Sequence, residues 1–570
     1  MKKDILLFEV MRIDSVQDML IGSARRFGNK LALEDFNETP ISKVSFNSLL
    51  ENVLRFGAAL RNLGINERDH VAVIGENRVQ WAISYLTAMA FNLVVVPVDK
   101  NLGVNEILNI LHESEACAII FSETFEPMFR EKKASLKHLK HYICMDLMKH
   151  ENGFHSMIEL INRSPAIDPS NLPQINPDEM AVIIFTSGTL GRAKGVMLSQ
   201  KNLASNLMDM VSQFGIFPED RFLSILPMHH TYECTCGMLC PLFGGSSIYY
   251  ARSLKTVVED LQRSKATILL GIPLLYDKMF KAIYRGIKEK KVVAPIIRPM
   301  IRIADVLEKI GWKSSKKVLF KEIHHRFGGS IRCFIAGGAA PDPMVAKGLR
   351  EFGFGFVQGY GLTETSPILT LNRLDDFKDD SAGLPLPHVQ LKIANSDQDG
   401  IGEVYAKGPN VMIGYYKNEM VTADAFDGEW FKTGDLGFVD GDGFLHISGR
   451  KKNVIISKSG KNVFPEEIED VLNRSPFIME SMVFGEADAK EGEIIGAQIV
   501  VDAEAFIELS ETKGVQITPE LIHDVIDGEI RKVNHELPSY KQIKKFRVRD
   551  QEFQKTTTQK IKRFAVSTSD

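Results

Sequence analysis

Short apolar runs alternate with longer amphipathic stretches over much of the chain. Each run is rich in Val, Ile, Leu or Phe and has the length of one buried strand, and the stretches between them have helical spacing. The runs are His70–Ile74, Leu93–Val98, Ala118–Phe121, His141–Met145, Ala181–Phe185, Thr267–Leu270 and Ile331–Ile335. This alternation predicts an α/β fold built on largely parallel sheets.

The pattern changes after about Asp375, where shorter strands adjoin turn signals. Gln390–Ala394 precedes DQDGIG, and Phe438–Ile447 surrounds DGDG. An antiparallel region is therefore expected there. We place a domain boundary near Lys452, which divides the chain into a large domain over residues 1–451 and a small domain of mixed strands and helices over residues 452–570.

One segment, Val79–Val98, carries no charge and is long enough to span a bilayer. It contains the polar residues Gln80, Ser84 and Thr87, and it ends in β-branched residues around Pro97. These features predict a buried helix that runs into a buried strand, in preference to a transmembrane helix.

The composition narrows the class of protein. The chain has 570 residues, with 69 Lys and Arg against 73 Asp and Glu and a formal charge of -4. This balance argues against a nucleic-acid-binding protein. Six cysteines in so long a chain indicate a reducing compartment. The first residues, MKKDILLFEVMRID, lack an uninterrupted apolar core and a cleavage site, so no secretory signal is expected and the cytoplasm is the predicted location.

A helical, basic insert is expected between Lys278 and Arg326. It holds fourteen Lys or Arg residues against four acidic residues, in a chain that is acidic overall. A solvated helical face explains such a charge run. The alternative is peripheral contact with an anionic membrane or another anionic partner.

The strongest chemical signal is TSGTLGRAKG, residues 186–195, which directly follows the run Ala181–Phe185. Glycines allow backbone N–H groups to point at one anion, hydroxyl groups add donors, and Lys194 adds a positive charge. The segment lacks the G-x-x-x-x-G-K-[ST] spacing of a P-loop. It predicts a polyphosphate cradle rather than a plain surface loop. The candidate ligands are Thr186, Ser187, Gly188, Thr189, Gly191 and Lys194.

A second segment, QGYGLTET over residues 358–365, begins like a dinucleotide-binding loop but has Glu364 where that loop has its last glycine. An aromatic ring, a hydroxyl group and a carboxylate within a few residues suit a different task. They can stack on a base, contact a phosphate and bind Mg²⁺, the hard cation that accompanies phosphates.

The run HHTYECTCGMLC, residues 229–240, presents two histidines and three cysteines. Cys236 and Cys240 have the spacing of one helical face, so a zinc site is one interpretation. However, no second Cys pair has the spacing of a structural zinc site, and the cysteines lie in an apolar context. Buried thiols are therefore the favoured interpretation.

Five motifs together carry a family resemblance. TSGTLGRAKG, GYGLTET, WFKTGDLG (430–437), GRKKNVIISKSGKNVFPEEIE (449–469) and KTTTQKIKR (555–563) occur in the order and approximate spacing found in adenylate-forming enzymes. The resemblance covers nearly the whole chain. Within this superfamily the chain most resembles the long-chain fatty acyl-CoA synthetases, because LPMHHTYE (226–233) and the basic insert are similar to theirs.

The resemblance implies a fold and a reaction. The implied fold has a large N-terminal domain of two βα-layered sheets with a distorted β-barrel, followed by a small α+β domain on a hinge. The implied reaction joins a fatty acid to CoA at the expense of ATP, with Mg²⁺ as cofactor, through an acyl-adenylate formed with loss of pyrophosphate. The alternatives are an acyl-carrier protein as acceptor, a non-catalytic acyl- or nucleotide-binding protein, and a P-loop phosphotransferase, which the missing spacing disfavours.

The resemblance also assigns roles in the large domain. The 186–195 loop holds the β- and γ-phosphates, Thr363 contacts phosphate, and Glu364 binds Mg²⁺. His230 lies near the acyl carboxylate, and the helix after it lines the acyl tunnel, which leaves His229 without a role. Tyr360 and the turn Gly337–Ala339 are assigned to the two sides of adenine, and Asp435 and Arg450 are assigned to the ribose hydroxyls. The residues expected around ATP or AMP, beyond the 186–195 loop, are Gly338, Ala339, Gln358, Gly359, Tyr360, Gly361, Asp435, Ile447 and Arg450.

In the small domain, Lys560 matches the lysine that bridges the carboxylate and the α-phosphate during adenylation. Gln554 and Gln559 stand where the family has a proline and a glycine, although the register through Lys560 and Arg563 is kept. A point cation suits this role because negative charge accumulates where the two anions meet.

The hinge of the family maps to Lys452, beside which Asn453 replaces a frequent acid. Rotation about it is expected to withdraw Lys560 and admit CoA for the second step. The loop assigned to the pantetheine tunnel of CoA contains Ser459, Gly460 and Lys461.

Overall fold

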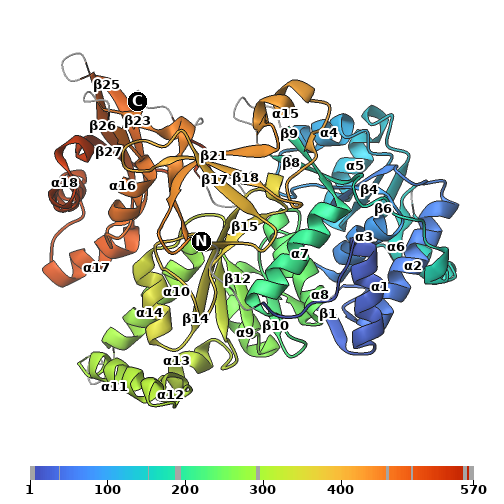
Figure 1. Ribbon diagram of the computed structural model, residues 1–570, viewed down its shortest axis with the longest axis horizontal. Coiled ribbons are helices and arrows are strands. Elements are labelled where there is room, and N and C mark those ends of the chain that lie inside the picture. Colours follow the sequence, from blue (N-terminus) through green and yellow to red (C-terminus); the bar gives the residue numbers. More distant parts are fainter. Residues whose placement is uncertain are drawn as a thin grey trace. The chain divides into compact units, whose positions relative to one another are not determined.

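The computed structural model describes residues 7–563 and 566, except 38, 152, 187–193, 290–294, 458–460, 489–491 and 556–560 (Figure 1). The chain forms two compact units. The larger one comprises Met1–Leu391, Ala406–Phe431 and Asp442–Phe444, and the smaller one comprises Lys392–Tyr405, Lys432–Gly441 and Leu445–Asp570. The prediction of an α/β fold with a large N-terminal part and a smaller C-terminal part is confirmed.

An eight-stranded sheet of the larger unit contains most of the apolar runs that the sequence singles out. Its strands lie in the order β19-β9-β8-β4-β3-β5-β6-β7. The pairs from β4 through β7 are parallel, as is β4 with β8, whereas β8 and β9 form an antiparallel hairpin. The strands are β3 (His70–Ile74), β4 (Val94–Pro97), β5 (Ala118–Phe121), β6 (His141–Cys144), β7 (His155–Ser156), β8 (Met180–Thr186), β9 (Lys194–Ser199) and β19 (Gly414–Tyr415).

A nine-stranded sheet completes the framework of this unit, in the order β16-β15-β14-β13-β12-β10-β11-β1-β2. Strand β14 pairs parallel with β13 through Gln358 and antiparallel with β15 from Gly359 onward. The strands are β1 (Leu31–Asp35), β2 (Lys43–Ser45), β10 (Arg221–Ser224), β11 (Ser247–Tyr250), β12 (Ile268–Gly271), β13 (Cys333–Ala336), β14 (Gly355–Gly361), β15 (Ile368–Leu371) and β16 (Leu384–Pro385).

Helices cover both faces of each sheet, as a parallel sheet requires. One apolar cluster joins residues of both sheets to helices α1 (Val16–Phe27), α2 (Phe46–Asn62), α3 (Val79–Ala90), α7 (Gln200–Phe214) and α8 (Cys240–Gly244). The other face of the eight-stranded sheet packs on α4 (Val104–Glu113) and α5 (Glu126–Lys132). The other face of the nine-stranded sheet packs on α9 (Val257–Ser264), α10 (Pro273–Glu289), α11 (Ile297–Lys309), α13 (Lys321–Arg326) and α14 (Pro343–Glu351).

The uncharged segment Val79–Val98 is a buried helix followed by a buried strand, as predicted. Every residue of α3 is buried, and so is every residue of β4. Ser84 donates a hydrogen bond to the carbonyl of Gln80 at 2.7 Å, which satisfies one of the polar groups within the helix. Among the described residues, no helix has both the length and the apolar character to cross a membrane.

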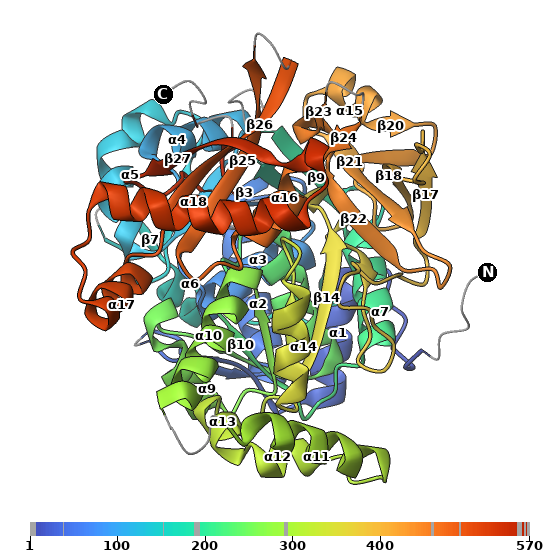
Figure 2. The ribbon, with the colours of Figure 1, turned by 90° about the vertical axis from the view of Figure 1, so that its left-hand side faces the viewer.

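The smaller unit contains most of the predicted antiparallel region and a second core. Strands β21 (Trp430–Val439) and β22 (Leu445–Arg450) pair antiparallel, in a five-stranded sheet with β17 (Gln390–Ala394), β18 (Gly402–Lys407) and β20 (Phe426–Asp427). Farther along the chain, α16 (Pro465–Leu472), α17 (Ala503–Lys513) and α18 (Pro519–Glu536) pack on a sheet of β25 (Ile478–Asp488), β26 (Gly492–Val501) and β27 (Ile543–Arg549) (Figure 2). Residues 452–463 follow β22 and contain β23 (Ile455–Ile456) and β24 (Asn462–Val463).

Candidate active site

The polyphosphate segment joins the antiparallel strands β8 and β9. Thr186 and Lys194 are register partners at the end of this hairpin, and the Thr186 hydroxyl donates to the Lys194 carbonyl at 3.4 Å. Ser187, Gly188, Thr189 and Gly191 lie outside the described residues. Their assignment to phosphate binding remains a prediction.

Lys194 and Glu364, predicted from separate motifs, meet at Tyr415. The Tyr415 hydroxyl donates a hydrogen bond to Glu364 Oε1 at 2.9 Å. The Lys194 ammonium lies 5.2 Å from the centroid of the Tyr415 ring, within the range of a cation–π contact. The cause is the pairing of β19 with β9, which sets Tyr415 opposite Val196. The structure thus groups a cation, an aromatic ring and a carboxylate.

The backbone around Glu364 is held by a tight turn between β14 and β15. A Cβ on Gly361 would lie 1.8 Å from the carbonyl oxygen of Pro367, so a larger residue does not fit. The Leu362 N–H donates to the same carbonyl at 3.0 Å, and the Met412 N–H donates to the Glu364 carbonyl at 2.8 Å. Thr363 begins the 3₁₀ turn that carries Glu364.

The segments predicted to flank adenine lie next to each other at the carboxyl ends of adjacent strands. Ala336, the last residue of β13, pairs with Gln358 of β14. The turn with Gly338 and Ala339 follows β13, while Gly359 and Tyr360 continue β14. Ligands of α/β sheets bind at such carboxyl ends. The side chain of Gln358 itself donates to the carbonyls of Asp379 (3.2 Å) and Ser381, so it anchors a neighbouring loop.

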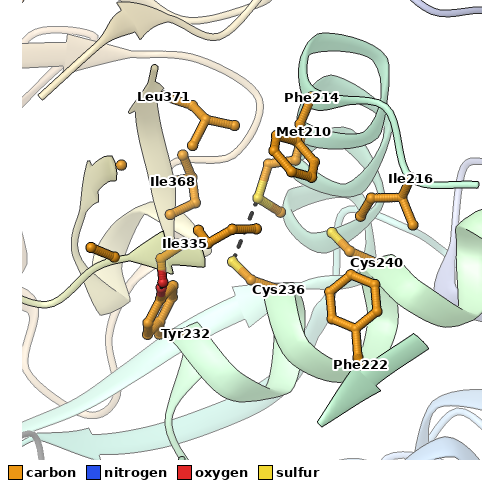
Figure 3. A pocket seen from close by; sticks show the side chains of 12 residues that line it. Met210, Phe214, Ile216, Phe222, Tyr232, Cys236, Cys240, Ile335, Ile368 and Leu371 are labelled. Atoms are coloured by element: carbon orange, nitrogen blue, oxygen red, sulfur yellow. Dashed lines mark hydrogen bonds between the residues drawn. The ribbon is translucent and has the colours of Figure 1, made fainter. Parts of the chain in front are cut away.

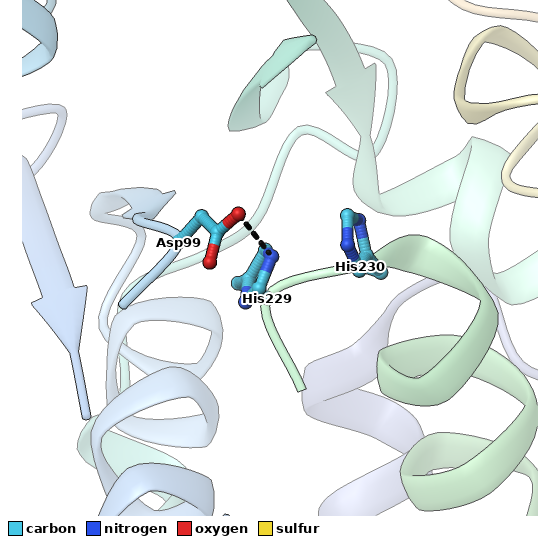
Figure 4. Close-up of side chains that lie close together, drawn as sticks. All are labelled: Asp99, His229 and His230. Atoms are coloured by element: carbon cyan, nitrogen blue, oxygen red, sulfur yellow. Dashed lines mark ion pairs between the residues drawn. The ribbon is translucent and has the colours of Figure 1, made fainter. Parts of the chain in front are cut away.

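His229 acquires a partner that the sequence did not indicate. Its Nε2 lies 3.5 Å from Asp99 Oδ2, and its ring lies 4.1 Å from the His230 ring, centroid to centroid (Figure 4). Burial raises the pKa of Asp99, but the hydrogen bond and charge of His229 outweigh it and lower that pKa overall. Burial, reinforced by His229, lowers the pKa of His230 to about 3. His230 is therefore a neutral imidazole at physiological pH.

Asp99, His229 and His230 also satisfy a geometric requirement for a cation site. One ligand atom of each lies within 4.8 Å of the others, and among the described residues they form the group of His, Cys, Asp and Glu side chains with this property. The three cysteines of the 229–240 run do not belong to it. Burial raises the pKa of Cys234, Cys236 and Cys240, so these thiols are protonated, as expected of buried thiols.

An apolar pocket adjoins the predicted adenine-binding strands (Figure 3). It measures about 430 Å³, including space open to solvent. Ala336 and Gly359 contribute to its wall, as do Tyr232 and Cys236 of the π-helix Tyr232–Leu239. The helix after His230 therefore lines an apolar cavity. The complete lining is Met210, Phe214, Ile216, Phe222, Tyr232, Cys236, Cys240, Ile335, Ala336, Gly359, Ile368 and Leu371.

A buried carboxyl group supports the π-helix beside this pocket. Glu233 is 1% exposed, and burial raises its pKa to about 8, while the hydrogen bond from Ser224 lowers it. The Ser224 hydroxyl donates to Glu233 Oε1 at 2.5 Å. A Cβ on Gly237 would lie 2.7 Å from Glu233 Cδ, so a larger residue at position 237 would displace the Glu233 carboxyl group. Glu233 is a neutral structural acid at pH 7.

In the smaller unit, the two residues assigned to ribose bind each other. Arg450 Nε lies 2.8 Å from Asp435 Oδ1, and the two residues are register partners in β21 and β22. Ile447 lies three residues earlier on β22, opposite Gly437. An arginine paired with a carboxylate presents both donors and acceptors, which suits a vicinal diol.

The predicted hinge and CoA loop lie just beyond β22. Lys452 lies in the 3₁₀ turn Lys451–Asn453, where Asn453 donates a hydrogen bond to Glu466 at 2.7 Å. The Lys461 ammonium lies 4.5 Å from the centroid of the Tyr540 ring. Ser459 and Gly460 lie outside the described residues.

Lys560 also lies outside the described residues, but the chain on both sides of it is anchored. Lys555 and Ile561 form an antiparallel bridge, and Lys555 Nζ lies 2.7 Å from Glu480 Oε2. Arg563 donates to both carboxylate oxygens of Glu469. Burial raises the pKa of Glu469 to about 7 even though the Arg563 charge opposes this shift.

Comparison with known proteins places the chain in a family. The family described as AMP-binding enzyme matches residues 22–416, and AMP-binding enzyme C-terminal domain matches residues 467–560. The chain belongs to the AMP-binding enzymes.

Individual relatives cover most of this AMP-binding enzyme. It is 29% identical over 550 residues to the long-chain-fatty-acid–CoA ligase FadD15 of Mycobacterium bovis, covering 90% of this chain and 89% of the relative. It is 29% identical over 556 residues to the long-chain-fatty-acid–[acyl-carrier-protein] ligase AEE15 of Arabidopsis thaliana, covering 84% and 76%. The crystal structure of ATP-bound MatB from Rhodopseudomonas palustris superposes with a TM-score of 0.76 at 24% identity, covering 97% and 98%, which supports the fold.

Two residues near the predicted site of this AMP-binding enzyme escaped prediction. Asp99 lies beside His229, more than a hundred positions farther along the chain. Tyr415 reaches the predicted site residue Glu364 from β19. An isolated Asp after the β-branched run Val94–Val96 and a Tyr after Gly414 were the signals available. Neither has a spacing relationship to the motif it joins.

Proposed function

We propose that this AMP-binding enzyme activates a long-chain fatty acid with ATP and transfers the acyl group to CoA. The observation that carries the proposal is the apolar pocket that shares Gly359 with the QGYGLTET segment. An apolar wall next to a predicted nucleotide site suits a substrate with a hydrocarbon tail and a reactive carboxylate. The fatty-acid ligases named above are similar over most of the chain.

The first step is attack of a carboxylate oxygen on the α-phosphorus of ATP. The new bond joins this oxygen to phosphorus, and pyrophosphate leaves with the electron pair of the broken P–O bond. Two anions must approach, so catalysis depends on positioning and charge neutralisation. Lys194 and the 186–195 segment take the β- and γ-phosphates, and neutral His230 donates a hydrogen bond to the carboxylate. Lys560 supplies the cation between the carboxylate and the α-phosphate.

The residues present fit a magnesium cofactor. Mg²⁺ is usually held by one or two carboxylates together with substrate phosphates and waters. Glu364 is the carboxylate of the site, and its Oε1 is fixed by the Tyr415 hydroxyl. When bound, the ion supplies charge neutralisation to the phosphates. Tyr415 holds the carboxylate in the orientation that this role needs.

The second step is attack of the CoA thiolate on the acyl carbonyl, with AMP as the leaving group. The proposal includes a domain rotation about Lys452 that brings the 459–461 loop toward the pantetheine and removes Lys560. Asp435 and Arg450 hold the ribose of the adenylate. The separate core of the smaller unit supports movement as one body.

The decisive experiment is a pyrophosphate-release assay over a panel of carboxylic acids, with CoA and an acyl-carrier protein offered separately. We expect release with long-chain acids and thioester formation with CoA. Thioester formation with the carrier protein but not with CoA would show that the carrier protein is the acceptor. Nucleotide and acid binding without pyrophosphate release would identify a binding protein.

The proposal extends to the place where the enzyme meets its substrate. Long-chain fatty acids partition into bilayers, and the insert Lys278–Arg326 carries the excess positive charge noted above. We infer that this insert approaches anionic membranes by electrostatic attraction. Weaker vesicle binding after neutralisation of the insert lysines would support this, and unchanged vesicle binding would contradict it.

A further inference from the structure

Large apolar side chains lie exposed on two short neighbouring helices of the basic insert. Helix α11 (Ile297–Lys309) is followed by a turn and by α12 (Ser315–Leu319). We call the exposed surface of these segments the α11–α12 face. Its apolar members and their exposed fractions are Ile303 (55%), Val306 (58%), Ile310 (75%), Trp312 (47%) and Val318 (56%).

The exposure follows from the orientation of α11. Ile297, Ile301 and Ala304 face inward and belong to the core cluster beneath the nine-stranded sheet. Residues 303, 306 and 310 are three and four positions apart, so they share the opposite side of the helix. The core is complete without them. In Figures 1 and 2, α11 and α12 lie at the edge of the larger unit.

Trp312 is held in place rather than left on a loose end. Its backbone N–H donates to the Leu307 carbonyl at 2.9 Å, and Gly311 before it adopts a φ of +104°, a conformation that favours glycine. The Ser315 hydroxyl donates to the Ala304 carbonyl at 3.1 Å, which ties α12 to α11. The apolar face is thus a formed surface.

Basic side chains alternate with the apolar ones. Arg302, Lys309, Lys313 and Lys317 are exposed on the same segments. The two acidic residues of α11, Asp305 and Glu308, both lie 2.9 Å from the ammonium of Lys316. Their charge is therefore partly compensated within the insert, and the α11–α12 face is positive where it meets solvent.

We propose that the α11–α12 face inserts its apolar side chains into the interfacial region of an anionic bilayer. This goes beyond electrostatic approach, because the binding energy comes from removal of apolar surface from water. Lysine and arginine stems extend along such a surface while their charges reach the headgroups. Tryptophan prefers the same interface. Protein interfaces, in contrast, are depleted in lysine at their centre.

The direct test is binding of the full-length protein to vesicles of phosphatidylcholine with and without phosphatidylglycerol. We expect the Trp312 fluorescence to shift to the blue on binding and to be quenched by a brominated lipid. Trp312→Phe should lose both signals. The chain has 3 Trp residues, and Trp312 is the one on the α11–α12 face, whereas Trp81, for example, is only 1% exposed. No blue shift on binding would overturn the insertion.

A matched pair of variants separates insertion from attraction. Val306→Ser with Ile310→Ser should lower the partition coefficient about tenfold or more, and the loss should persist at high salt, where surface charges are screened. Leu254→Ser with Met420→Ser removes other exposed apolar residues (69% and 82% exposed) and should leave partitioning unchanged. The proposal would be overturned if the Val306→Ser, Ile310→Ser variant partitions like the wild type. It would also be overturned if the wild type binds an acidic carrier protein but not vesicles.

This test does not depend on the reaction. The Val306→Ser, Ile310→Ser protein should show wild-type pyrophosphate release with a water-soluble acid in the absence of vesicles. Failure of the proposed reaction would leave the partitioning result intact, and failure of insertion would leave the reaction intact.

Discussion

The Tyr415 hydroxyl donates a hydrogen bond to the Glu364 carboxylate, while the Lys194 ammonium lies over the face of the same tyrosine ring. Residues from three parts of the chain are therefore in contact through one tyrosine. Tyr415 orients the carboxylate and limits the positions open to the lysine. This gives the tyrosine a positioning role in the proposed phosphate site.

Tyr415→Phe should lower kcat/KM for ATP by roughly tenfold to a hundredfold, since a hydrogen bond to a charged group contributes about 1.5–3 kcal/mol. The Mg²⁺ concentration that gives half the maximal rate should rise, because Glu364 loses its fixed orientation. The measurement is a Mg²⁺ titration of pyrophosphate release at fixed ATP. Tyr416→Phe is the matched control, since its hydroxyl donates to the exposed Glu115 at 3.5 Å. If Tyr415→Phe leaves the magnesium dependence unchanged, Tyr415 does not position Glu364.

His230 should not titrate in the working range. Burial and His229 lower its pKa to about 3, so the imidazole stays neutral between about pH 5 and pH 8. His230→Gln should reduce adenylation without altering the shape of the pH profile in this range. The rate of pyrophosphate release from pH 5 to pH 8 is the measurement, with His325→Gln as an exposed control. A wild-type inflection near pH 6.5 that disappears only in His230→Gln would contradict the assignment.

Glu233 should make the fold less stable as the pH rises. Burial raises its pKa from 4.5 to about 8. The contribution of this group to the free energy of unfolding is therefore complete below about pH 4.5 and is lost as the pH rises through about 8. Glu233→Gln cannot ionise. Its apparent Tm minus that of the wild type should therefore be more positive at pH 8 than at pH 5. A constant Tm difference across this range would show that Glu233 does not titrate in this way.

Cys236 should influence the length of acid accepted, because its side chain lines the apolar pocket. Cys236→Phe adds volume to this wall and should raise KM for long-chain acids about tenfold or more, while short acids are affected less. Cys236→Ser keeps the size and serves as the control. A uniform loss with all acids would indicate damage to the helix instead of a shortened pocket.

Lys560→Ala should abolish adenylation yet leave thioester formation from supplied acyl-adenylate largely intact. The lysine is assigned to the first step, where it neutralises two approaching anions. The two half-reactions can be measured separately with the same preparation. Equal loss in both steps would refute the assignment.

The sequence predicted the sheets because their strands are buried on both faces and are therefore continuously apolar. The structure confirms β3, β5 and β17 at the predicted residues, and the ends of β4, β6, β8, β12 and β13 differ by one or two positions. Frayed strand ends carry little periodic signal. The antiparallel return of β14 against β15 was not predicted, because the glycines of QGYG give no strand pattern.

The site was only partly readable from motifs. Lys194 and Glu364 were predicted individually, but their common partner Tyr415 depends on the pairing of β19 with β9. Asp99 joins His229 through the packing of distant segments. The π-helix after His230 arises where a buried carboxyl and Gly237 share one turn, and no residue spacing distinguishes it from an α-helix.

We expect this enzyme to activate a carboxylate as an adenylate before any thiol takes part. Exchange of labelled pyrophosphate into ATP, measured with a long-chain fatty acid and without CoA, tests this most directly. We expect exchange that requires the acid and Mg²⁺ and is lost in Lys560→Ala. Exchange that requires CoA, or formation of ADP and phosphate in place of AMP and pyrophosphate, would contradict it.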